Sequence, residues 1–139
     1  MGQDNKTLKG DAPGNLDTQL VQRIKAEEAS VAAVVVRIKE ELARFGFSAQ
    51  AAALDGGLHN TQLRIDDFDG NQSLYGEWHD SLGHCKGSLL IHGSGQVYAE
   101  LDVLQDHPSK PQWYVESVTC WGLASALNAE LGLLPALTD

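Results

Sequence analysis

Two histidines flank a short polar segment near the middle of the chain. His79 and His84 stand on either side of residues 80–83 (Asp-Ser-Leu-Gly), whose residue types favour a four-residue turn between two strands. In such a hairpin the histidines lie opposite each other, and Glu77 faces the same side two residues earlier. Two imidazoles and a carboxylate suit zinc or iron. His79, His84 and Glu77 are therefore a candidate metal site, the alternative being an exposed turn that binds nothing.

An acidic segment precedes this hairpin. Asp67, Asp69 and Asn71 have the spacing of the first ligands in a calcium-binding loop. However, Gln72 occupies the position of the required glycine, and Trp78 occupies the position of the bidentate glutamate. We therefore interpret the segment as an acidic turn.

Residue types suited to catalysis occur without the partners that catalysis needs. Ser94 lies between two glycines that a hairpin turn already explains, and it lacks the strand-to-helix context of a nucleophile. Glu100 and Glu116 would act as an acid–base pair only if they faced each other in a pocket. We therefore predict no catalytic residue and no cofactor, which favours a protein that is not an enzyme.

The strands that position these residues are predicted from one hairpin. A three-residue turn at residues 93–95 (Gly-Ser-Gly) pairs Ile91 with Val97, and Leu90 with Tyr98. Side chains alternate between the two faces of a strand, so the first pair lies on an apolar face and the second on an outer face. With the preceding hairpin included, the predicted apolar face comprises Leu74, Trp78, Cys85, Leu89, Ile91, Val97 and Leu101.

A further strand is predicted over residues 113–121, and an earlier one over about residues 60–66. If Val103 lies opposite Trp113, then Glu100 faces Glu116. In that register Val115, Ser117 and Thr119 point inward, whereas Tyr114, Glu116 and Val118 point outward. Cys120 would then lie near the outer face, and we expect it and Cys85 to be free thiols.

Helical periodicity surrounds the strands. Leu16–Phe45 has apolar residues at helical spacing, Ser48–Leu54 suggests a short helix, and Leu123–Leu131 suggests a C-terminal helix ended by a glycine. Residues 1–14 are polar and are predicted to be disordered. The fold class is therefore α+β: residues 15–139 form a single domain, an antiparallel meander of about five strands with the long helix packed on its apolar face.

The outer sheet face is the principal candidate binding surface. It combines aromatic and acidic side chains on an otherwise polar sheet, a combination typical of recognition surfaces. The predicted outer binding set is Tyr75, Glu77, Leu90, Tyr98, Glu100, Tyr114 and Glu116. The alternative is a small-ligand or enzyme pocket between helix and sheet, with Trp78, Trp113 and Trp121 as apolar walls.

The net charge of −9 arises entirely from residues 55–139. Residues 1–54 hold seven acidic and seven basic residues, whereas residues 55–139 hold twelve acidic against three basic ones. Nucleic acid is therefore excluded as a partner, and a protein partner or self-association is expected. The apolar run Val31–Val36 offers a seam for a homodimer. No membrane span or secretory signal is apparent, so we expect a cytoplasmic protein.

Overall fold

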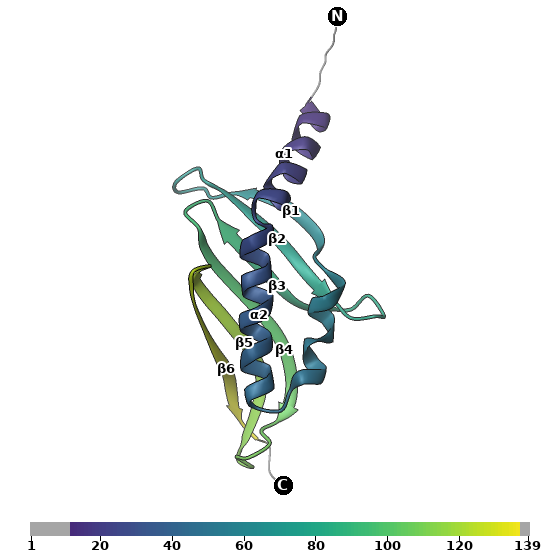
Figure 1. Cartoon of the computed structure of the whole chain (residues 1–139), viewed down its shortest axis with the longest axis vertical. Helices are drawn as coiled ribbons and strands as arrows, with labels where there is room; N and C mark the ends of the chain where they lie inside the picture. Colours follow the sequence, from purple (N-terminus) through teal and green to yellow (C-terminus); the bar gives the residue numbers. More distant parts are fainter. Residues whose placement is uncertain (1–11, 137–139) are drawn as a thin grey trace, which may run out of the picture.

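A six-stranded antiparallel sheet forms the scaffold of the protein, with helices packed on one face (Figure 1). The computed structural model describes residues 12–136 of the 139-residue chain. In chain order the elements are α1 (Ala12–Ala26), α2 (Glu28–Arg44), the 3-10 helix η1 (Ser48–Gly56), β1 (His59–Ile65), β2 (Gln72–His79), β3 (Cys85–His92), β4 (Gln96–Asp106), β5 (Trp113–Leu123) and β6 (Ala126–Pro135). The strands are ordered in space as in sequence. The predicted α+β meander is confirmed, with six strands instead of about five.

The long helix predicted over Leu16–Phe45 is divided in two. At Glu27 the backbone has φ −99° and ψ 6°, which interrupts the helix between α1 and α2. The Glu27 amide still donates to the carbonyl oxygens of Arg23 and Ile24, so the chain continues in nearly the same direction. As Figure 1 shows, α1 extends beyond the sheet and α2 crosses it. Of the segment predicted to be disordered, residues 1–11 lie outside the described part, and residues 12–14 belong to α1.

The core lies between α2, η1 and the inner face of the sheet. Val34, Ile38 and Leu42 recur every four residues along α2, so they form one stripe that is fully buried. Ala51 and Leu54 of η1 extend the same cluster over the sheet. The sheet contributes Leu74, Trp78, Leu89, Ile91, Val97, Ala99, Leu101, Val103, Val115, Val118 and Cys120. One face of the meander is therefore the floor of the core.

The β3–β4 hairpin has the predicted register. Ile91 pairs with Val97 on the buried face, and Leu90 pairs with Tyr98 on the opposite face. The positive φ of Gly95, 96°, closes the short turn as the sequence indicates. Because this turn has few residues and a required glycine, local chemistry is sufficient to set the pairing.

The predicted β4–β5 register is wrong. Glu100 pairs with Thr119, not with Glu116, and Val118 is fully buried instead of pointing outward. The connection between the strands is shorter than predicted, since Asp106 already pairs with Tyr114. An irregularity between Asp102 and Gln105, where Leu104 has φ 55°, then shifts the pairing by one residue and exchanges the two faces of β5. An extra residue in one strand changes the pairing of everything beyond it. For the same reason, the prediction that Thr119 points inward and Cys120 outward is reversed: Cys120 is fully buried.

The predicted C-terminal helix at Leu123–Leu131 is also wrong, because this segment forms most of β6. β6 pairs with β5 from Ala126 to Pro135. Its Ala, Leu and Glu residues favour helices locally, but they also alternate, with Leu127 and Leu131 partly buried against the core and Glu130 exposed. Pairing with β6 gives hydrogen-bond partners to the backbone N–H and C=O groups of β5, and this gain overrides the local preference of residues 126–131 for a helix.

Candidate functional site

A row of large side chains crosses the outer face of the sheet. Tyr75, Leu90, Tyr98 and Trp121 are successive partners in the registers of β2, β3, β4 and β5. Tyr98 is 54% exposed and Trp121 38%. Helices α2 and η1 lie on the opposite face (Figure 1). We call these four residues the aromatic row. The prediction that Tyr98 and Glu100 face away from the helix is thus confirmed, and the apolar face lies beneath it.

Tyr75 is held more firmly than the other members of the row. The guanidinium carbon of Arg64 lies 3.7 Å from the centre of the Tyr75 ring. The Tyr75 hydroxyl donates to Glu77 Oε2 at 2.7 Å, and this bond raises the pKa of Tyr75. Tyr98, by contrast, stands open to solvent. The row therefore has a fixed end at β2 and an accessible end at β4 and β5.

An acidic row runs beside the aromatic row. Glu77, Ser88, Glu100, Thr119 and Glu130 are successive partners from β2 to β6. The Ser117 hydroxyl donates to Glu100 Oε2 at 3.2 Å, which holds that carboxylate on the outer face. Glu77 and Glu100 are each two residues along their strand from a tyrosine of the aromatic row, and side chains two residues apart share a face. The carboxylates of the acidic row therefore lie directly beside the aromatic row.

Two other members of the predicted outer set lie elsewhere. Glu116 is exposed, but it lies at the irregularity between Val115 and Ser117, outside the acidic row. Tyr114 pairs with Asp106 and Leu134, seven residues along β5 from Trp121. At about 3.3 Å per residue, that separation is roughly 23 Å. The three tyrosines are consequently not one cluster.

The three tryptophans do not form the walls of one pocket. Trp78 is fully buried on the inner face, Trp121 belongs to the aromatic row on the outer face, and Trp113 begins β5 and is 36% exposed. Sequence reasoning assigned Trp121 to a pocket because the β4–β5 register was wrong. The observed register instead makes it the neighbour of Tyr98.

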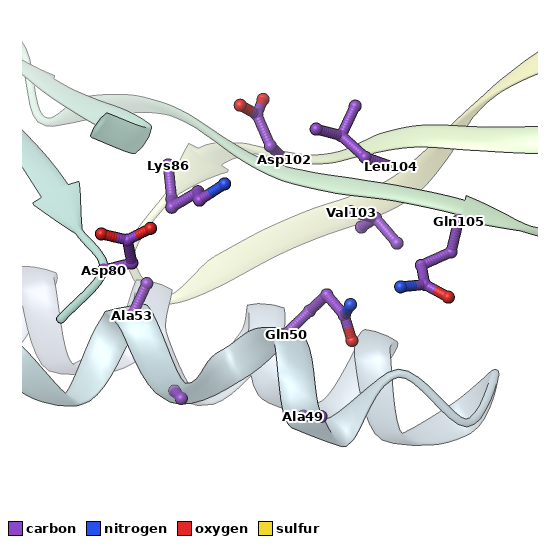
Figure 2. A pocket seen from close by; sticks show the side chains of 10 residues that line it. Ala49, Gln50, Ala53, Asp80, Lys86, Asp102, Val103, Leu104 and Gln105 are labelled. Carbon is purple, nitrogen blue, oxygen red and sulfur yellow. The ribbon is translucent and has the colours of Figure 1, made fainter. Parts of the chain in front are cut away.

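A hollow of about 350 Å³ does lie between helix and sheet, but other residues line it. Figure 2 shows Gln50 and Ala53 of η1 on the side of β4, where Val103 and Gln105 project toward the helix, with Asp102 and Leu104 turned away. Asp80 is at one end, where its carboxylate accepts the backbone amides of the adjacent turn and has a lowered pKa as a result. Lys86, Gln50 and Gln105 also line the hollow, but no serine, cysteine or histidine among the described residues does, so its lining offers no hydroxyl or thiol nucleophile with a neighbouring imidazole base.

The predicted pairing of the two histidines is wrong. The turn holds one residue more than expected, so His79 pairs with Cys85, while His84 stays in the turn beside Asp80 with 68% of its side chain exposed. A second irregularity follows, and Trp78 pairs with Gly87 instead of Cys85. Cys85 is consequently exposed on the side of His79, not buried as predicted.

The structure also brings two histidines together that the sequence did not connect. The rings of His59 and His79 are stacked, with centroids 4.4 Å apart and planes 6° from parallel. His79 Nε2 lies 3.0 Å from Glu77 Oε1. Hydrogen bonds from His79, Tyr75 and Asn60, in that order, hold the pKa of Glu77 at about 2. A regular pairing of β1 with β2 would not have revealed this, because an irregularity between His59 and Gln62 shifts the register and makes His59 the partner of Glu77.

Comparison with known proteins finds no matching family model, no similar curated protein and no similar solved structure. Among the described residues, the helices are too short or too polar to cross a membrane.

Proposed function

We propose that the protein is a non-enzymatic binding module that uses the outer sheet face to bind a partner protein with a basic surface. The observation that carries this proposal is the aromatic row itself, with Tyr98 and Trp121 exposed beside a row of carboxylates. Exposed tyrosine and tryptophan supply large contact area at low cost in side-chain entropy. A sheet face with this composition is typical of a recognition surface.

The charge of the face selects the kind of partner. Glu77, Glu100 and Glu130 lie along the acidic row, and Arg64 is stacked on Tyr75. A second copy of the same face would bring like charges together, whereas lysine and arginine side chains would be attracted. Arginine can also stack on tyrosine and tryptophan rings. A basic partner therefore fits this face better than a homodimer does.

The helix seam predicted for a homodimer is mostly used within the chain. Val34 is fully buried and Val31 and Val35 pack against the core, which leaves Val36 as the exposed valine of the run. We accordingly place the partner surface on the sheet and not on α2, and a cytoplasmic location remains part of the same proposal. Light scattering on a sizing column measures the molar mass of the parent protein and of Val36→Glu and so tests the alternative. A dimeric parent and a monomeric variant would show that the interface lies on α2 and not on the sheet.

A defined peptide tests the proposal directly. The probe is a labelled peptide in which arginine alternates with leucine, and the matched control peptide carries glutamate in place of each arginine. We expect saturable binding of the arginine peptide that weakens as salt is added, and no binding of the control. Tyr98→Ala and Trp121→Ala should each raise the dissociation constant by roughly 5- to 30-fold, the effect of losing about 1–2 kcal/mol at an aromatic contact.

Exposed residues on the helical side supply the matched controls. Val21 and Val36 are 64% and 55% exposed, so Val21→Ala and Val36→Ala remove apolar surface without touching the sheet. These variants should bind like the parent protein. The proposal fails if the outer-face variants bind normally, or if the helix variants weaken binding as much as they do.

A further inference from the structure

Potential metal ligands converge where β1, β2 and β3 lie side by side. Glu77 and His79 are two residues apart on β2, so their side chains share a face. Cys85 on β3 is the direct partner of His79, and His59 on β1 is the direct partner of Glu77. Directly opposed residues have Cβ atoms only about 5 Å apart. The sheet therefore gathers oxygen, nitrogen and sulfur donors from neighbouring strands at one place.

The donor atoms are close enough for one ion. One ligand atom each from Glu77, His79 and Cys85 lies within 4.8 Å of both of the others, and His79 Nε2 is 3.0 Å from Glu77 Oε1. Ligands of a tetrahedral zinc ion, at about 2.0–2.3 Å from the metal, are separated by roughly 3.3–3.7 Å. Small side-chain rotations about exposed Cys85 would close the difference.

We propose that Glu77, His79 and Cys85 bind one zinc-like divalent cation, with a solvent molecule as the fourth ligand. The His59 ring stacks on His79 and so lies beside the site instead of contributing a donor atom to it. The mixed donor set favours zinc over calcium or magnesium, which prefer oxygen ligands alone. His79 and Glu77 keep 16% and 19% of their side-chain surface exposed and Cys85 is exposed, which gives an ion access from solvent. This inference does not depend on the partner surface proposed above.

The surroundings of Glu77 are those of a metal-binding carboxylate. Its Oε2 atom accepts a hydrogen bond from the Tyr75 hydroxyl at 2.7 Å, and its Oε1 atom accepts one from Asn60 Nδ2 at 2.9 Å. Outer hydrogen bonds of this kind orient a ligand and keep it ionised. When a cation replaces the His79 contact, the Tyr75 bond remains as the outer support of the carboxylate.

A second group of possible ligands, Asp66, Asp69 and His92, has a simpler explanation. The carboxylate of Asp66 accepts the amides of Phe68 and Asp69, and that of Asp69 accepts the amide of Asn71. These bonds build the turn between β1 and β2. We therefore assign no ion to that group, and it serves as an internal control.

Zinc titration of the full chain without a histidine tag tests the proposal. We expect one-to-one binding by calorimetry and slower alkylation of Cys85 in the presence of zinc. Cobalt in place of zinc should show thiolate-to-metal charge-transfer absorption. Cys85→Ser and His79→Gln should each weaken zinc binding by at least the roughly 10- to 100-fold that even outer-shell changes cause. Cys85→Ser should also abolish the cobalt absorption.

Two histidines outside the site supply the matched controls. His84→Ala, in the turn next to the site, and His92→Ala, in the second group, should bind zinc like the parent protein. Circular dichroism establishes that each variant is folded. Cys85 is exposed, so its replacement by serine leaves the core intact. The proposal is overturned by an absence of saturable zinc binding, by unchanged binding in Cys85→Ser, or by loss of binding in either control variant.

Discussion

Two neighbouring residues on β3 allow a direct test of which sheet face is covered. Ile91 is fully buried beneath the helices, and Leu90 lies on the outer face between Tyr75 and Tyr98. Replacing either by alanine removes three carbon atoms from the same strand. At about 0.8 kcal/mol per buried methylene, Ile91→Ala loses roughly 2.4 kcal/mol of transfer free energy, and the cavity brings the total to about 3–5 kcal/mol.

Leu90→Ala should cost much less, about 1 kcal/mol, because its side chain is only partly buried and the space it leaves is open to water. Urea denaturation followed by circular dichroism measures both free energies of unfolding. Equal losses, or a larger loss for Leu90→Ala, would refute the reasoning. Such a result would mean that something covers the outer face, and the proposed partner surface would be lost with it.

Three further predictions concern the sheet and its thiols. Gly87→Ala should destabilise the protein by about 1–3 kcal/mol in urea denaturation, because a Cβ atom at Gly87 would press against the backbone carbonyl of Glu100. Burial raises the pKa of the Cys120 thiol from the usual 9.0 to about 11, so the folded protein keeps this proton while the unfolded chain releases it. The free energy of unfolding should therefore be constant below pH 9 as far as this thiol is concerned, and should fall by up to about 3 kcal/mol between pH 9 and 11. Cys120→Ala should show a shallower decline over the same range. Finally, alkylation of the folded protein near pH 8 should modify exposed Cys85 and spare buried Cys120, as peptide mass spectrometry would show; equal modification of both would contradict the assigned faces.

Prediction from sequence succeeded where short-range chemistry was sufficient. The turn at residues 93–95 set the β3–β4 pairing, and helical spacing identified Ile38 and Leu42 as part of the buried stripe of α2. The spacing assigned Val35 to that stripe, whereas Val34 is the fully buried valine and Val35 is only partly buried. Both patterns are complete within about ten residues of chain, so no distant contact was needed to interpret them.

Prediction failed where one residue of loop or bulge changed a register. The turn after β2 holds one residue more than predicted, so the partner of His79 is Cys85 and not His84. The irregularity after Asp102 places Val118 on the inner face, although it was predicted on the outer one. A one-residue slip moves a side chain to the other face, and single-sequence patterns do not resolve it. The same limit hid the place of Trp121 in the aromatic row and that of His59 beside the candidate metal site.

The sequence by itself determined the class of fold, the two-sided character of β3 and β4, and the concentration of negative charge after residue 54, because these depend on composition and alternation along the chain. The tertiary structure alone decided that residues 126–135 form a strand and that His59, His79 and Cys85 meet, because hydrogen-bond partners from other strands override local preference and set each register. Both proposals for this protein depend on those registers: the aromatic row on the pairing of Tyr98 with Trp121, and the metal site on the pairing of His79 with Cys85.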